Sequence, residues 1–173
     1  MTFRFLEAIK ELIEILIRKS RLLTGGLLIL MVSLTCYDVV MRYVFNAGSV
    51  GMQEMEWHLF AAIFLMGGAY TLREDQHVRV DVFYRSEWFT ERTRNRIDIF
   101  GTVFFLLPFC VVVIWTSAPF VYDAYLHGEM SPDPGGLKHR WIIKSLIPLG
   151  FFLLLLQGLL GIADRLSALC KEE

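Results

Sequence analysis

The length of the apolar runs is the feature that most constrains this chain. A helix needs roughly 20 mostly apolar residues to cross the hydrocarbon core of a bilayer. Backbone groups in lipid must find their hydrogen bonds within the protein, and four segments of this length cannot close a β-barrel. The sequence therefore predicts an all-α membrane protein, a single membrane domain over residues 1–173, with four transmembrane helices at about 22–45, 57–72, 97–121 and 141–163.

The composition agrees with this prediction and excludes other classes of protein. Hydrophobic residues make up 55% of the chain and charged residues 20%, and the net charge is only -1. No basic tail is present, which argues against a nucleic-acid partner. The three cysteines, Cys36, Cys110 and Cys170, form no CxxC pair. They fit neither a disulfide framework nor a zinc site, and we interpret them as small buried apolar side chains.

The N-terminal segment has a helical pattern of its own. Between residues 3 and 19, apolar and charged side chains alternate at helical spacing, so that one face is apolar and the other carries lysine, arginine and glutamate. Such a helix lies along a membrane surface instead of crossing it. We therefore predict an amphipathic interfacial helix over residues 1–21, and a packing face against another cytosolic element is the open alternative.

The lysines and arginines predict the orientation. They are concentrated in the N-terminal segment, in the connection between the second and third runs, and in the C-terminal tail. The opposite side of the membrane would carry only Arg42, Lys138, Arg140 and Lys144. Cytoplasmic loops of membrane proteins carry the excess of basic residues. Both termini and the 73–96 connection are therefore predicted to be cytoplasmic.

The stretch that follows the second run mixes valines with charged residues. We interpret residues 73–85 as a cytoplasmic interfacial elbow in which valines enter the acyl chains, while Arg73 and Arg85 contact phospholipid headgroups. Its Asp75, His77 and Asp81 supply only one nitrogen ligand, and no second histidine is predicted on that side. A metal site is therefore disfavoured.

Four ionisable residues lie near the outer ends of the first two runs. Asp38 and Arg42 are four positions apart, so they share a helix face and are predicted to form a neutralised pair that fixes helix packing. Glu54 and Glu56 are two positions apart and point to different faces, which disfavours acid-base catalysis. One of them is expected to cap the second helix and the other to pair with a basic residue on this side.

Two further patterns concern the helices themselves. Pro108 lies in the middle of the third run, which predicts a kink there. Small residues, which let helices approach closely in lipid, are grouped at Gly25–Gly26, Gly67–Ala69, Gly150, Gly158 and Gly161. No nucleotide-binding loop, nucleophile elbow or HExxH motif occurs. A chain this small without an evident reaction centre suggests a subunit of a larger complex.

Three motifs appear in order along the chain: "YDVVMRYVFN", "QEMEWHLFAAIFLMGGAYTLREDQHVRVDVFY" and "GGLKHRWIIKSLIPLGF". Together they resemble the small membrane subunit of tripartite ATP-independent periplasmic (TRAP) transporters, the DctQ-like family. The resemblance extends from about residue 25 to 160. It implies a noncatalytic scaffold in the bacterial inner membrane, with no cofactor of its own. Its implied partners are membrane phospholipids, a separate large permease subunit and a periplasmic binding protein.

In this family the large subunit holds the substrate and sodium sites and imports, by secondary active transport, a solute that is commonly an organic acid anion. The resemblance also implies structural or subunit-interface roles for the motif positions Arg42, Glu54, Glu56, His77, Arg79 and Asp81. We expect the same role for Asp38.

An alternative of another class is a four-helix haem-binding anchor of a respiratory enzyme. It requires histidines at matching depth in adjacent spans. The sequence instead places His58 at a helix mouth, and His127 and His139 in a loop.

Overall fold

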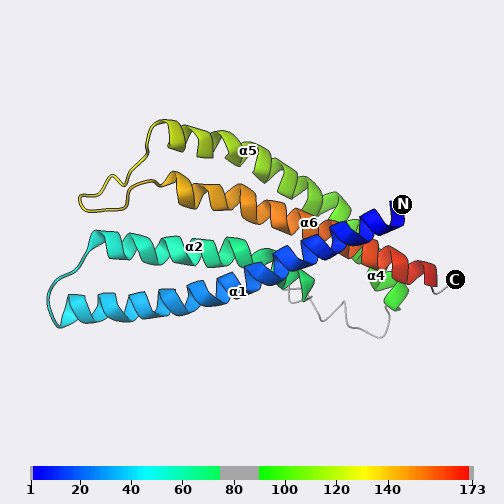
Figure 1. Cartoon of the computed structure of the whole chain (residues 1–173), viewed down its shortest axis with the longest axis horizontal. Helices are drawn as coiled ribbons and strands as arrows, with labels where there is room; N and C mark the ends of the chain where they lie inside the picture. The colour runs from blue at the N-terminus through cyan, green and yellow to red at the C-terminus, as the bar shows by residue number, and fades with distance from the viewer. Residues whose placement is uncertain (1, 75–89, 172–173) are drawn as a thin grey trace.

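The fold consists of long helices joined by short loops at one end. The computed structural model describes residues 2–74 and 90–171, and all regular structure within these residues is helical. The predictions for His77, Arg79, Asp81 and Arg85, and most of the predicted elbow, lie outside the described residues. The elements, drawn in Figure 1, are α1 (Thr2–Tyr43), α2 (Val50–Arg73), α4 (Glu91–Gly101), η1 (Thr102–Leu106), α5 (Leu107–Leu126) and α6 (Trp141–Lys171).

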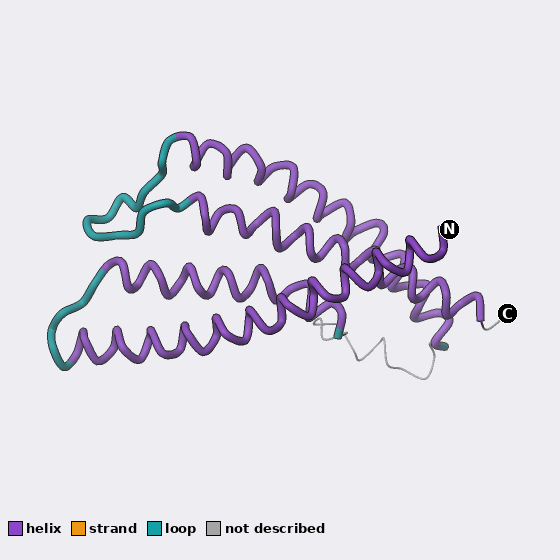
Figure 2. The backbone as a smooth tube through the Cα atoms, viewed as in Figure 1, coloured by secondary structure: helices purple, strands orange, loops and turns teal. Residues whose placement is uncertain are grey.

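The helices lie side by side in the order α1, α2, α6, α5. α2 packs against both α1 and α6, and α5 packs against α6. The α1–α2 loop and the α5–α6 loop lie together at one end of the bundle, while both termini lie at the other (Figure 2). We call these the loop end and the terminal end. Having both termini at one end agrees with an even number of membrane crossings.

Three stretches within the described residues are long and apolar enough to cross a membrane: Lys10–Tyr43, Glu91–Leu126 and Trp141–Cys170. α2 has 24 residues but carries Glu54, Glu56 and His58 in its first half, and it does not belong to this group. It nevertheless lies alongside α1 and α6 for its length. That α2 forms a fourth span therefore stays a prediction.

The first helix differs from the expected division into two segments. α1 runs without interruption from Thr2 to Tyr43, so no boundary separates residues 1–21 from the first span. Ile13 and Ile17 are buried against α2 and α6, whereas Leu12 and Leu16 are exposed. The amphipathic pattern thus serves at least partly as a packing face, the alternative that the sequence left open. An interfacial position of this segment stays a prediction.

The buried core is small for a chain with so many apolar residues. It contains Ile13, Ile17, Met66, Ala69 and Leu153, contributed by α1, α2 and α6. Most large apolar side chains face outward, including Phe64 at 72% exposed and Trp115 at 80%. Monomeric soluble proteins rarely expose continuous apolar surface on this scale. The outer faces are therefore suited to lipid or to another membrane protein.

A widened turn precedes the proline at which a kink was predicted. Residues Thr102–Leu106 form a π-helical segment, and the N–H of Leu107 donates to the carbonyl of Thr102, five residues earlier. Pro108 cannot donate a hydrogen bond, and its ring would crowd the carbonyl of Phe104 in a regular α-helix. A π turn relieves this crowding because it changes the path of the preceding turn.

Candidate functional site

At the loop end, Glu54 connects α2 to the α5–α6 loop. The hydroxyl of Ser131 donates to one of its carboxylate oxygens, and the backbone N–H of Leu137 donates to the other at 2.6 Å. These two bonds, from Ser131 first and from Leu137 second, lower the pKa of Glu54 below its usual value. Gly136 makes this arrangement possible, because a Cβ there would lie 2.8 Å from Glu54 Oε2. Glu54 is thus a loop anchor and not a helix cap.

The pair predicted at the end of the first span is formed in the structure. Arg42 Nη2 lies 2.5 Å from Asp38 Oδ2, and the carboxylate is buried. With its amide oxygen turned toward the guanidinium, Gln53 of α2 also accepts hydrogen bonds from Arg42. The ion pair therefore connects α1 to the start of α2. Whether these residues also contact another subunit stays a prediction.

Within the described part of the chain, Glu56 lacks the basic partner that the sequence predicted for one of the two glutamates. Its Oε1 atom is buried and has no hydrogen-bond partner among residues 2–74 and 90–171. Lys144, one of the expected partners, pairs instead with Glu129 near the start of the α5–α6 loop. The sequence analysis did not single out Glu129, and the 15 positions between it and Lys144 give no helical spacing that could have identified it.

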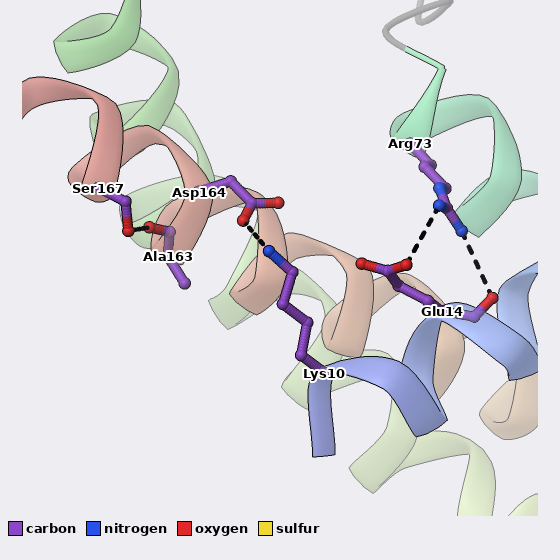
Figure 3. Close-up of polar contacts among 6 residues, drawn as sticks. All are labelled: Lys10, Glu14, Arg73, Ala163, Asp164 and Ser167. Carbon is purple, nitrogen blue, oxygen red and sulfur yellow. Dashed lines mark hydrogen bonds and ion pairs between the residues drawn. The ribbon is translucent and has the colours of Figure 1, made fainter. Parts of the chain in front are cut away.

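At the terminal end, ion pairs join helices that are distant in sequence. Lys10 Nζ lies 2.5 Å from Asp164 Oδ1, and Arg73 Nη2 lies 3.6 Å from Glu14 Oε2. Both pairs are drawn in Figure 3. Arg73, expected at lipid headgroups, is thus close to a carboxylate of α1, and its contact with lipid stays a prediction. The sequence analysis missed Lys10, Glu14 and Asp164 as partners, because no spacing rule relates positions on different helices.

A groove runs along the outer face between α2 and α6. Its loop-end half is lined by bulky side chains and two basic residues: Trp57, Phe60, Ala61, Phe64, Leu65, Phe120, Arg140, Ile143, Lys144 and Ile147. We call this half the aromatic groove. The other half has glycines in its walls and is lined by Thr24, Ile63, Phe64, Leu65, Gly67, Gly68, Thr71, Gly150, Phe151 and Leu154. We call it the glycine groove.

The glycines of the glycine groove fall into two kinds. A Cβ at Gly150 would lie 2.6 Å from the carbonyl oxygen of Leu65, so Gly150 permits the close contact of α6 with α2. A Cβ at Gly68 would meet nothing within 4 Å. Packing within the described residues therefore does not require a glycine at position 68, and this side of α2 can accept the close approach of another helix.

These features describe surfaces for packing and not a reaction centre. Among the described residues, no three histidine, cysteine, aspartate or glutamate side chains are grouped so that they could hold a metal ion. Within the same residues, Cys110 is buried while Cys36 and Cys170 are exposed, and none forms a disulfide. The interpretation of the cysteines as buried side chains therefore holds only for Cys110.

Comparison with protein-family models gives a match over most of the chain. Residues 31–168 match the family model described as "Tripartite ATP-independent periplasmic transporters, DctQ component". No curated protein matches the chain. The family match includes the loop anchor at Glu54, the Asp38–Arg42 pair and both halves of the groove except Thr24.

Proposed function

Because the chain belongs to the DctQ family, the small permease component of TRAP transporters, we propose that it is a noncatalytic scaffold. It braces a large permease subunit during ion-driven uptake of an organic acid. A periplasmic binding protein delivers the solute, and sodium binds the large subunit instead of this chain. The family match is the observation that carries this proposal.

The distribution of apolar side chains supports a scaffold role. The core of the bundle is small, and the outer faces are apolar over long distances. In lipid, helices associate through close packing at small residues. The glycine groove, with open space above Gly68, is therefore the surface on which we place a transmembrane helix of the large subunit.

The proposed orientation follows the basic residues. The terminal end, with Lys10, Arg73 and Arg165, faces the cytoplasm of the bacterial inner membrane. The loop end then faces the periplasm, where the α5–α6 loop is exposed to the binding protein. Cysteine accessibility tests this orientation. A single cysteine at Lys138 should react with an impermeant maleimide in intact cells, whereas Cys170 should react only after lysis.

The decisive experiment is affinity purification of this chain from native membranes, followed by reconstitution. We expect a much larger membrane protein to co-purify. We also expect solute uptake that needs both membrane chains and the binding protein, that follows a sodium gradient, and that needs no ATP. Solute transport by this chain alone in liposomes would contradict the scaffold role.

Variants separate assembly from substrate choice. Arg42→Gln and Glu56→Gln should lower the yield of the large subunit in the purification, and the solute preference of the complexes that still form should not change. Asp133→Asn is a suitable control, because Asp133 is exposed and its carboxylate makes no hydrogen bond or ion pair among the described residues. A variant that assembles normally but prefers a different solute would contradict the proposal.

The haem-anchor alternative gains no support from the structure. His58 Nδ1 faces the carbonyl of Glu54 near the start of α2, and His127 Nδ1 faces the carbonyl of Asp123 at the end of α5. Both histidines lie at the loop end, not at depth within adjacent spans. A Soret band in the purified complex would revive this alternative.

A further inference from the structure

The aromatic groove has a basic side chain whose hydrogen-bonding capacity is unused. The backbone of Arg140 is hydrogen-bonded to Glu129 and Lys144, but among the described residues its side chain forms no hydrogen bond and no ion pair, and its buried Nε atom has no partner. Its only close contact of note is with Trp57, whose ring centroid lies 5.5 Å from the guanidinium carbon. An arginine has five N–H donors. Leaving these donors without acceptors at a membrane boundary is costly, unless a ligand or a water molecule accepts hydrogen bonds from them.

The neighbouring charges are already in use. Lys144 pairs with Glu129, and its Nζ lies 3.8 Å from the centre of the Phe120 ring. Glu54 accepts its two hydrogen bonds from the α5–α6 loop, and its charge acts on Arg140 only at longer range. Neither carboxylate is therefore free to hold a cationic group. The spare charge at the mouth of the groove is the positive charge of Arg140, which is complementary to an anion.

The walls below Arg140 suit an acyl chain better than a helix. Trp57, Phe60 and Phe64 follow one another along α2 and are 43%, 61% and 72% exposed. Only Ala61 among the lining residues is small, whereas helix contacts in membranes favour small residues on the approaching faces. From Arg140 to Ile147 the groove extends roughly 10 Å at the helical rise per residue. This length lies within one leaflet, whose hydrocarbon depth is about 15 Å.

We propose that the aromatic groove binds an anionic phospholipid such as phosphatidylglycerol, with its phosphate on Arg140 and an acyl chain along Trp57, Phe60 and Phe64. Under the orientation proposed above, this lipid belongs to the periplasmic leaflet. The bound lipid would cover the α2–α6 contact at the loop end and would keep Arg140 close to Glu54, the loop anchor. This inference depends on the proposed function only because it takes the chain to lie in a membrane in the orientation given above.

Fluorescence quenching by brominated lipids tests the site, because Trp57 lines the groove. Two full-length proteins are prepared, one with Trp57 and one with Trp115 as the sole tryptophan. Trp115 is 80% exposed on α5 and does not line the groove, so it reports bulk lipid. Each protein is placed in vesicles of phosphatidylcholine and phosphatidylglycerol, with bromine on the acyl chains of one lipid or the other at equal mole fraction.

We expect brominated phosphatidylglycerol to quench Trp57 about fivefold more effectively than brominated phosphatidylcholine, the ratio that corresponds to about 1 kcal/mol for one basic residue near an anionic headgroup. The ratio for Trp115 should be near one. Arg140→Gln should bring the Trp57 ratio close to that of Trp115. Lys138→Gln should not change it, because Lys138 is exposed on the adjoining loop and does not line the groove.

Three results would overturn the lipid site. The first is equal quenching of Trp57 by both lipids in the single-tryptophan protein that retains Arg140. The second is a preference that survives Arg140→Gln. The third is loss of Trp57 quenching when the large subunit is bound, which would mean that a protein segment occupies the groove. Absence of Trp115 quenching by either lipid would instead contradict the membrane position of α5, and with it the proposed function.

Discussion

The backbone N–H of Leu137 donates a hydrogen bond of 2.6 Å to Oε2 of Glu54, although the two residues are 83 positions apart. Together with the hydroxyl of Ser131 on the other oxygen, this bond fixes the α5–α6 loop to the start of α2. At the loop end, Glu54 therefore links the α1–α2 pair of helices to the α5–α6 pair.

The first prediction concerns pH. The pKa of Glu54 lies below its ordinary value of 4.5, because the ionised carboxylate accepts the bonds from Ser131 and Leu137. A group with a lowered folded pKa stabilises the protein above its unfolded pKa, and this contribution is lost as the pH falls through the folded pKa. We expect Glu54→Gln to lower the Tm of the detergent-solubilised chain at about pH 7, and the difference from wild type to shrink as the pH falls below 4.5 and through the folded pKa.

Asp133→Asn is the matched control for this experiment, since Asp133 lies exposed in the same loop and its carboxylate makes no hydrogen bond or ion pair among the described residues. Its Tm should follow that of the wild type throughout the titration. A Tm difference for Glu54→Gln that stays constant with pH would show that the charge of Glu54 does not stabilise the loop.

The second prediction concerns the ion pair of α1. Asp38 is only 4% exposed, so Arg42→Gln leaves a buried carboxylate without its cation. Loss of one partner of a buried charged hydrogen bond costs about 1–3 kcal/mol. The double variant Asp38→Asn/Arg42→Gln should recover much of that loss, because no unpaired charge remains. Denaturant titration of the three proteins in detergent measures the differences, and an additive double variant would contradict this account.

The third prediction separates two glycines of the glycine groove. Gly150→Ala places a methyl group 2.6 Å from the Leu65 carbonyl oxygen and should destabilise the bundle by about 1–3 kcal/mol. Gly68→Ala meets nothing within 4 Å and should leave the stability of the isolated chain within about 0.5 kcal/mol of wild type. Unfolding of the isolated chain in detergent provides the measurement.

At position 68, a larger side chain tests the proposed contact with the large subunit. Gly68→Leu should fold normally as an isolated chain but recover less of the large subunit in co-purification. Leu159→Ile, at an exposed position of α6 outside the groove, is the control for a change on an apolar face. Normal recovery of the large subunit with Gly68→Leu would remove the glycine groove from the proposed interface.

The fourth prediction ranks the ion pairs of the terminal end by exposure. Lys10 and Asp164 are 45% and 58% exposed, so their coupling in a double-mutant cycle should be about 0.2–1 kcal/mol and should weaken in high salt. Asp98 and Arg165 are 14% and 24% exposed, and Asp98 Oδ2 lies 3.2 Å from Arg165 Nη2. Asp98→Asn should therefore lower the free energy of unfolding more than Asp164→Asn does. A larger loss of stability for Asp164→Asn would show that burial does not determine the strength of these ion pairs.

Part of the fold and of the site follows from local sequence rules. Long apolar runs predict helices because lipid offers the backbone no hydrogen-bond partner, and the all-helical structure of the described residues agrees. The Asp38–Arg42 pair follows from the four-residue spacing that brings side chains together on one helix face. Pro108 marks the irregular turn because proline lacks the N–H that a regular helix needs.

The tertiary structure decided which residues from different helices meet. Glu54 found its partners in a loop that no periodicity relates to α2, and Arg73 lies beside Glu14, 59 positions away. The apolar stripe at Ile13 and Ile17 could have faced lipid or protein, and only the path of α1 across α2 and α6 buries it. Spacing along one helix is set by its fixed turn, whereas contacts between helices depend on their rotation, depth and loop paths, which a single sequence does not specify.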